Sequence, residues 1–294
     1  MKYHQIDRNL FIKNRAKFTA QMAPQSLAVF NSNDIYPVSA DSTLPFAQHR
    51  DIFYLSGVDQ EESILVVFPD AFEEKHREVL FLRETNEHIA IWEGEKLTKE
   101  RAFEVTGIKT VYWLSDFPTI FRKMMCEAEN VYINNNEHYR ASVETETRED
   151  RFIKKMKQEY PAHQYLRSNP ILQRLRSVKE PQEIALIQNA CDITEKGFRR
   201  ILSFVKPGVW EYEIEAEFAH EFLRNRSKGF AYTPIIASGN NANVLHYIEN
   251  NQQCKDGDLI LFDVAAEYAN YASDLSRTIP VSGRYSARQR EVYD

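Results

Sequence analysis

The chain has 294 residues, of which 43% are apolar and 27% are charged, so it can bury two cores of ordinary size, and we expect two domains. Its formal net charge is −6 and its acidic and basic residues are interspersed, which excludes the basic footprint of a nucleic-acid-binding protein. Three widely spaced cysteines without a CxxC motif exclude both a disulfide framework and a thiolate metal site.

The N-terminal stretch, MKYHQIDRNLFIKNR, lacks the uninterrupted apolar run of a signal peptide. No later stretch is apolar for the roughly eighteen residues that a membrane span requires. We therefore expect a soluble, cytoplasmic protein that has neither a membrane nor a nucleic acid as its partner.

Residues 8–135 alternate between amphipathic, helix-like stretches and short runs typical of strands. Those runs are SLAVF (26–30), IFYLSG (52–57), SILVVFP (63–69), VLFL (79–82), HIAIW (88–92), TVYWL (110–114) and NVYIN (130–134). The alternation predicts an α/β domain.

Residues 136–159 are densely charged and poor in strand formers, so we expect an exposed helix or loop there without chemistry of its own. The character of the chain changes next, where Pro170 and Pro181 bracket a short basic segment. We place the domain boundary near Asn169, which gives an N-terminal domain of residues 1–168 and a second domain of residues 169–294.

A long amphipathic helix begins at Pro181 and ends before Pro207-Gly208. Its apolar positions recur at steps of three and four residues: Ile184, Ile187, Cys191, Thr194, Phe198, Ile201 and Val205. A second helix follows from Glu211 to about Ser227, and short apolar segments then alternate with polar turns. This order predicts an antiparallel sheet covered by two helices on one face.

The segment LILFDVAAEYANYASDLSRTIP (259–280) carries two aspartates in a predicted hairpin. A tight turn spanning Glu267 to Asn270 would place Asp263 directly opposite Asp274, with Cβ atoms about 4.5–5.5 Å apart. Asn270 suits the turn because asparagine tolerates the left-handed conformation. Two carboxylates this close would force one to take up a proton unless a cation lay between them, and a hard divalent metal would serve.

The alternative is that one aspartate caps a turn while the other points into solvent, which is the commoner outcome for two aspartates at this spacing. The run before Asp263 favours the metal site, because Leu259–Phe262 is apolar and we expect it to be buried. A buried carboxylate needs a compensating charge or several hydrogen bonds.

His246 closes the loop ASGNNANVLHYIEN (237–250), shortly before the strand that ends at Asp263. A single histidine is more often a structural residue with satisfied hydrogen bonds than a catalytic one. Its position at the end of a loop rich in small and polar residues also suits a role beside the metals. Both interpretations stay open at this point.

Seven stretches resemble the aminopeptidase P branch of the pita-bread metallopeptidases, which carry a creatinase-like N-terminal domain. They are FYLSGVDQEES, IAIWEGEKL, RLRSVKEPQEI, KPGVWEYEIEAEFAHEF, SGNNANVLHYIEN, KDGDLILFDVAAEY and YASDLSRTIPVSGRYSARQREVYD. The resemblance implies an α/β creatinase-like domain followed by an α+β pita-bread catalytic domain. We expect only the first pseudo-symmetric half of the catalytic domain in this chain, and hence truncation within it.

The resemblance also implies a hydrolase with two divalent metal ions, commonly Mn²⁺, held by two Asp, one His and two Glu. Asp263 and Asp274 match the first two ligands, and His246 matches a histidine that helps to bind substrate or to stabilise the intermediate. The other three ligands and an assisting glutamate lie further along in members of this family, so we expect the chain alone to be inactive. Asn270 and Ser273 stand where those members often have glycine, and neither difference removes a ligand.

The function implied for the full-length protein is release of the N-terminal residue from peptides with proline in second position. A proline dipeptidase (prolidase) is the alternative within enzymes, because prolidases carry similar segments. A non-catalytic pita-bread interaction module is the alternative from another class. We expect Xaa-Pro peptides as substrates and a homo-oligomer as the assembled state.

Overall fold

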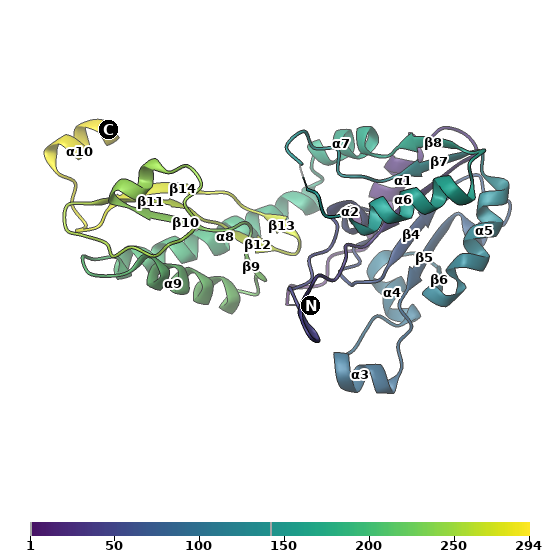
Figure 1. The fold of residues 1–294 in the computed structure, drawn as a ribbon, viewed down its shortest axis with the longest axis horizontal. Coiled ribbons are helices and arrows are strands. Elements are labelled where there is room, and N and C mark those ends of the chain that lie inside the picture. Colours follow the sequence, from purple (N-terminus) through teal and green to yellow (C-terminus); the bar gives the residue numbers. More distant parts are fainter. Residues whose placement is uncertain (1, 142) are drawn as a thin grey trace. The chain divides into compact units, whose positions relative to one another are not determined.

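The computed structural model describes residues 2–141 and 143–294, which form two compact units (Figure 1). One unit runs from Gln5 to Lys179, and the other comprises Glu180–Asp294 together with the N-terminal residues up to His4. Helix α7 (Asn169–Ser177) belongs to the first unit, because its Ile171 and Leu172 are buried in that unit's core. The units therefore divide later in the chain than the domain boundary expected near Asn169.

A six-stranded mixed sheet organises the first unit, in the order β6-β5-β4-β1-β7-β8. Neighbours pair antiparallel from β1 to β4 and from β4 to β5, whereas the β5–β6, β1–β7 and β7–β8 pairs are parallel. The strands are β1 (Ser26–Asn31), β4 (Ile64–Val67), β5 (Glu78–Leu82), β6 (Thr110–Trp113), β7 (Asn130–Ile133) and β8 (Gln164–Arg167); β2 (Pro37–Ser39) and β3 (Ser42–Thr43) form an exposed ribbon.

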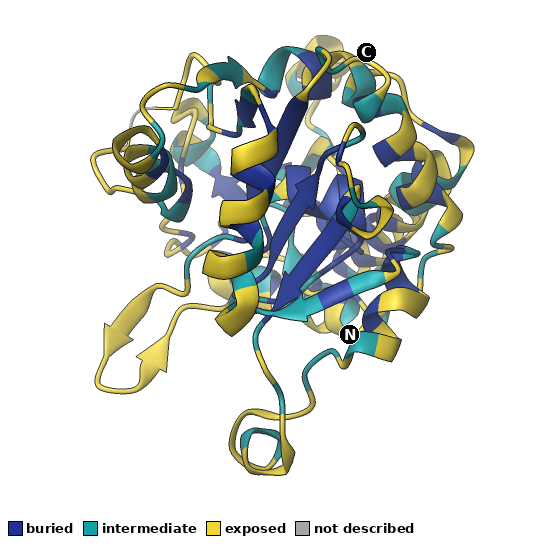
Figure 2. Cartoon of the chain, turned by 90° about the vertical axis from the view of Figure 1, so that its right-hand side faces the viewer, coloured by how far each residue is buried: buried dark blue, intermediate teal, exposed yellow. Residues whose placement is uncertain are grey.

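Helices cover both faces of this sheet, and Figure 2 shows its strands buried between their exposed outer sides. Helices α1, α2, α4 and α7 supply one apolar core, and α5 and α6 supply the other. The bounds are α1 (Asn9–Thr19), α2 (Arg50–Ser56), α3 (Glu87–Glu93), α4 (Lys99–Thr106), α5 (Phe117–Glu127) and α6 (Arg148–Glu159), with short 3₁₀ turns η1 (Glu74–His76) and η2 (Leu114–Asp116). The predicted α/β domain is confirmed.

Two of the seven predicted strands are helices. The run IFYLSG lies in α2, which begins after the cap residue His49 and ends at Gly57 with a φ of 73°. Nearly every residue of α2 is buried, and an apolar run without a polar face does not distinguish a buried helix from a buried strand. The run HIAIW lies in α3, where the side chain of Asn86 accepts the Ile89 amide proton and starts a helix instead.

The second unit is an antiparallel arrangement of strands covered by α8 (Pro181–Phe204) and α9 (Glu211–Arg224), as predicted. Phe198 of α8 and Phe218 of α9 meet the ring of Phe262 edge-on, with centroids 5.9 and 6.0 Å away. The strands are β9 (Gly229–Phe230), β10 (Ile235–Ser238), β11 (Leu259–Asp263), β12 (Ala266–Tyr268), β13 (Tyr271–Ala272) and β14 (Ser276–Pro280); η3 (Gly239–Asn243) follows β10, and α10 (Ala287–Tyr293) lies at the end.

The buried stripe of α8 differs in part from the predicted one. Thr194, Phe198 and Ile201 are buried as expected, but Ile184 and Cys191 are exposed. Small residues take their place in the contact: a Cβ added to Gly197 would lie 2.8 Å from Phe222 and 2.9 Å from Phe218 of α9. The two helices approach closely here, which a count of large apolar residues does not reveal.

No helix of the described residues is long and apolar enough to cross a membrane.

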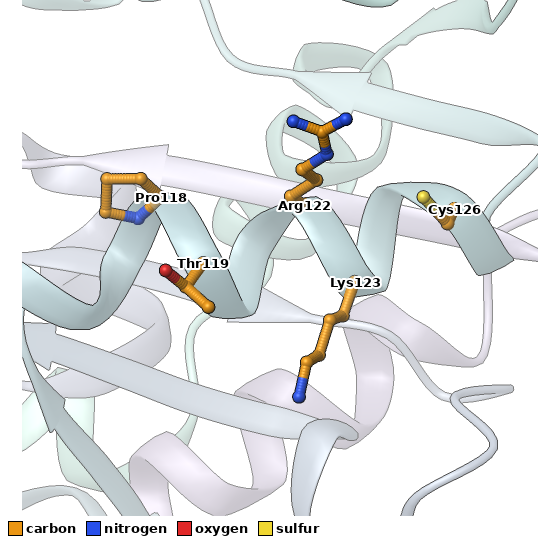
Figure 3. Close-up of a pocket in the computed structure, with 5 residues that line it drawn as sticks. All are labelled: Pro118, Thr119, Arg122, Lys123 and Cys126. Atoms are coloured by element: carbon orange, nitrogen blue, oxygen red, sulfur yellow. The ribbon is translucent and has the colours of Figure 1, made fainter.

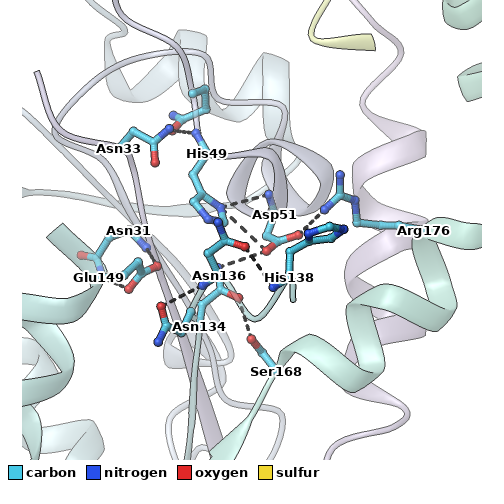
Figure 4. Close-up of polar contacts among 12 residues, drawn as sticks. Asn31, Asn33, His49, Asp51, Asn134, Asn136, His138, Glu149, Ser168 and Arg176 are labelled. Carbon is cyan, nitrogen blue, oxygen red and sulfur yellow. Dashed lines mark hydrogen bonds and ion pairs between the residues drawn. The ribbon is translucent and has the colours of Figure 1, made fainter. Parts of the chain in front are cut away.

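A cluster of polar side chains lies where the parallel strands β1, β7 and β8 end (Figure 4). The Asp51 carboxylate accepts hydrogen bonds from Arg176 at 2.6 Å and from the Asn134 amide at 3.2 Å. Beside it, the two carboxylate oxygens of Glu149 accept from the main-chain and side-chain nitrogens of Asn31, at 2.9 and 2.8 Å. Burial raises the pKa of Glu149 to about 8, against these hydrogen bonds and the nearby charge of Arg148, which lower it.

We expect Glu149→Gln to flatten the pH dependence of stability. The pKa of Glu149 is higher in the folded chain than its ordinary value of 4.5, so its contribution to stability is complete below pH 4.5 and is lost as the pH rises through about 8. Glutamine keeps the size and has no charge to bury, although its single oxygen accepts only one of the two Asn31 protons. The free energy of unfolding of the variant, relative to that of the parent, should therefore rise by about 1–3 kcal/mol between pH 4 and pH 9.

Free energies of unfolding measured between pH 4 and 9 check this prediction. Glu144→Gln, the same change at an exposed position, is the control and should follow the parent curve. Parallel curves for Glu149→Gln and the parent would show that Glu149 does not titrate in this range.

Candidate metal centre

The hairpin that carries the two aspartates turns at Ala269-Asn270. Both residues have positive φ values, 53° and 67°, and Tyr268 pairs with Tyr271 on either side of them. Asn270 is therefore a turn residue, as predicted, in a two-residue turn whose twist matches that of the flanking strands. The Asn270 amide also donates to the Glu267 side chain, which closes the turn.

This turn is centred one residue later than predicted, so the expected pairing of Asp263 with Asp274 is wrong. Asp263 lies opposite Ser276, the first residue of β14, and Asp274 lies in the short link between β13 and β14. The shift moves the partner position by two residues, which leaves both side chains on one face because strand side chains alternate with a period of two.

A tyrosine hydroxyl joins the two carboxylates. The Oη of Tyr232 lies 2.6 Å from Oδ1 of Asp263 and 3.1 Å from Oδ1 of Asp274, and its one proton can be donated to either. The structure thus brings the predicted pair together around a common oxygen. Asp263 is half-buried and Asp274 is exposed, so the expectation of a buried Asp263 is only partly met.

The incomplete burial of Asp263 follows from the strand before it. Ile260 and Phe262 are fully buried against the helices, whereas Leu259 and Leu261 on the other face are half-exposed. The run is buried on one face only, so Asp263 continues the partly exposed face.

Tyr232 stays protonated beside the carboxylates. Burial raises the pKa of its hydroxyl, and the hydrogen bond and charge of Asp263 raise it further, with a smaller effect from Asp274. Tyr232 was not among the residues predicted from the sequence. The signal for it is the pairing of β10 with β11, in which Ile235, three residues after Tyr232, lies opposite Asp263.

The chemistry of this pair fits a hard divalent cation. Carboxylate oxygens are preferred ligands of Mn²⁺ and Mg²⁺, and neither Asp263 nor Asp274 has a cationic partner among the described residues. Throughout the residues that the structure describes, no group of three or more His, Cys, Asp or Glu side chains is placed to hold a metal ion. The two carboxylates alone are fewer than the roughly six oxygen ligands that such a cation takes.

His246 is exposed in a turn after η3, and no hydrogen bond or ion pair joins it to another described residue. It is not a core histidine with satisfied hydrogen bonds. The structure does not bring it into contact with either aspartate, so its role beside the metals stays a prediction.

A separate hollow of about 500 Å³ lies on α5 in the first unit (Figure 3). It is open to solvent and is lined by Pro118, Thr119, Arg122, Lys123 and Cys126. None of the predicted site residues belongs to it.

Two family models match the chain. The aminopeptidase P N-terminal domain matches residues 11–132, and metallopeptidase family M24 matches residues 185–294. The Xaa-Pro aminopeptidase of Escherichia coli K12 is 32% identical over 291 residues, which are 99% of this chain and 66% of that protein.

Solved structures agree with these matches. Zn-substituted E. coli aminopeptidase P in complex with product superposes with a TM-score of 0.85 at 30% identity, covering 99% of this chain and 66% of that one. An aminopeptidase of Pseudomonas aeruginosa gives a TM-score of 0.88 at 28% identity, covering 98% and 65%. The chain thus spans about two thirds of the length of these three matched chains. Its α/β domain and the pita-bread unit that carries the paired aspartates show that it belongs to the aminopeptidase P family.

Proposed function

We propose that this protein is a metal-dependent exopeptidase that releases the N-terminal residue from peptides with proline in second position. The observation that carries the proposal is the convergence of Asp263 and Asp274 on the Tyr232 hydroxyl, in a chain whose relatives are Xaa-Pro aminopeptidases. Asp263 and Asp274 would hold two divalent ions, most simply Mn²⁺, together with further ligands besides these two.

Bound divalent ions would polarise the peptide carbonyl and lower the pKa of an attacking water. The residues of this chain orient and support that chemistry. Tyr232 keeps its proton and holds the two carboxylates on one side of the hairpin. His246, on its exposed loop, would donate a hydrogen bond to the substrate carbonyl or to the oxyanion that develops there.

The proposed substrate needs a dedicated site. The Xaa-Pro bond is a tertiary amide without an N–H group, so enzymes that bind that donor in an extended backbone handle it poorly. A site that binds the free N-terminus and the proline ring does not depend on the missing donor.

The protein encoded by the whole gene tests the proposal. With Mn²⁺ it should release the first residue from an Xaa-Pro-Yaa tripeptide but not from Xaa-Ala-Yaa, and a chelator should stop the reaction. Preference for an Xaa-Pro dipeptide over the tripeptide would identify a prolidase instead. Hydrolysis of neither peptide would overturn the proposal and favour the interaction module.

We expect residues 1–294 prepared alone to release nothing from Xaa-Pro peptides and to bind Mn²⁺ weakly. Two carboxylates supply too few ligands to fix two ions. Calorimetric Mn²⁺ titration and a peptide assay measure both properties, with Asp263→Asn in the same chain as the control for specific binding. Metal-dependent release of the first residue by this chain, absent from the control, would contradict the prediction.

A further inference from the structure

A buried carboxylate lies at the start of α9. Glu211 is 0% exposed, and its side chain accepts five hydrogen bonds. The Ser238 amide and hydroxyl donate at 2.7 Å each, the Asn241 side chain at 3.4 Å, the Tyr247 hydroxyl at 2.7 Å and the Gln252 amide at 2.9 Å. A charge buried this completely is stable only with such a set of donors.

These donors all come from one segment, which we call the His246 loop (residues 238–252). Ser238 ends β10, Asn241 lies in η3, Tyr247 directly follows His246, and Gln252 lies at the far end. Glu211 therefore ties together both ends and the middle of the loop. Among the described residues, Ala242 and Tyr247 of the loop also join a small apolar cluster with Ile235, Ala237 and Leu261.

One of these hydrogen bonds holds Tyr247, the residue directly after His246. The Tyr247 hydroxyl donates to Oε2 of Glu211 and also accepts the amide proton of Asn251 at 3.2 Å, which closes the chain around it. Burial, and then the hydrogen bond to Glu211, raise the pKa of Tyr247 to about 12, so the hydroxyl keeps the proton it donates. The Tyr247 side chain is thus held at its hydroxyl group.

From these contacts we infer that Glu211 is the positioning residue for His246: it holds the exposed loop in one conformation and thereby sets where the imidazole is presented. The inference rests on the proposed function for the role of His246 itself. It does not require Glu211 to touch substrate or metal. The exposed imidazole has no hydrogen bond or ion pair to another described residue that would hold it in place.

Amide hydrogen exchange on residues 1–294 tests the anchoring without any activity. In Glu211→Gln, exchange should accelerate at least about 10-fold within residues 238–252 and remain unchanged in α8, while the imidazole NMR resonance of His246 shifts. Tyr247→Phe, which removes one hydroxyl and keeps the ring, should do the same mainly between residues 247 and 251. Glu213→Gln is the matched control, because Glu213 caps the same helix but does not touch the loop.

Full protection of the loop in both Glu211→Gln and Tyr247→Phe would overturn the inference, whether or not the protein is a peptidase. Acceleration in Glu213→Gln equal to that in Glu211→Gln would also overturn it, because a general loss of helix capping would then explain the effect. The Tyr247→Phe variant keeps the test decisive if Glu211→Gln does not fold.

The protein encoded by the whole gene then shows whether the positioning acts through His246. Glu211→Gln should lower kcat on an Xaa-Pro peptide about 10-fold with metal content unchanged. Combined with His246→Ala, it should cause no further loss beyond that of His246→Ala alone. A further loss in the double variant would overturn positioning through His246. Full activity of His246→Ala would instead contradict the proposed role of that histidine, and hydrogen exchange would then decide whether Glu211 anchors the loop.

Discussion

Asp263→Asn is expected to lose metal and activity together in the protein encoded by the whole gene. Asparagine keeps the size of the side chain but removes one negative charge from the proposed metal site, and its amide nitrogen would not bind a cation. Loss of an outer partner of a metal ligand typically costs 10–100-fold, so loss of the ligand itself should lower turnover on an Xaa-Pro peptide by more than about 100-fold. Metal analysis of the purified variant, beside its turnover, measures both effects.

His246→Ala is the comparison that separates metal binding from substrate handling. It should retain its metal and still lose about 100-fold in turnover, since one stabilising contact to the developing oxyanion is removed. A His246→Ala protein as poor in metal as Asp263→Asn would place His246 among the ligands. An Asp263→Asn protein with its full metal content would remove Asp263 from them.

Phe262→Ala is expected to destabilise the second unit by about 3–5 kcal/mol. The ring is 0% exposed and meets Phe198 and Phe218 edge-on, so its removal leaves a cavity between the sheet and both helices. Denaturant unfolding followed in the second unit measures the loss. Phe72→Ala, at a side chain that is 90% exposed, is the control and should change stability by less than about 0.5 kcal/mol.

If the neighbouring phenylalanine rings filled the cavity, the loss of stability would be as small as at a surface position. A Phe262→Ala variant within about 1 kcal/mol of the parent would therefore contradict the assignment of this ring to the core. It would also remove the reason for a fixed position of Asp263, the next residue along β11.

The second unit was predictable from the sequence because its helices carry strong end signals. Pro181 lies in the first turn of α8, and Pro207-Gly208 follows its end, so local chemistry alone sets both bounds. The helices α2 and α3 were not predictable in the same way. Each begins at a cap residue, His49 or Asn86, that precedes a run rich in strand-forming residues.

The candidate site shows the same division between local and distant information. The turn at Asn270 and the common face of the two aspartates follow from nearby residues. The pairing of Asp263 depends on which residues turn, and a one-residue error in the turn changes the partner by two positions. Tyr232 lies 31 residues before Asp263 in sequence, so its contact requires the pairing of β10 with β11.

The strand order of the first unit has a consequence for synthesis on the ribosome. β1 is among the first elements made, yet its parallel neighbour β7 begins about one hundred residues later, and β8 pairs only after that. At 5–20 residues per second, one edge of β1 lacks its partner for roughly 5–20 seconds while the chain emerges. An apolar strand with an unpaired edge can pair with other chains, so binding of a chaperone to this nascent segment would lower the risk of aggregation during synthesis.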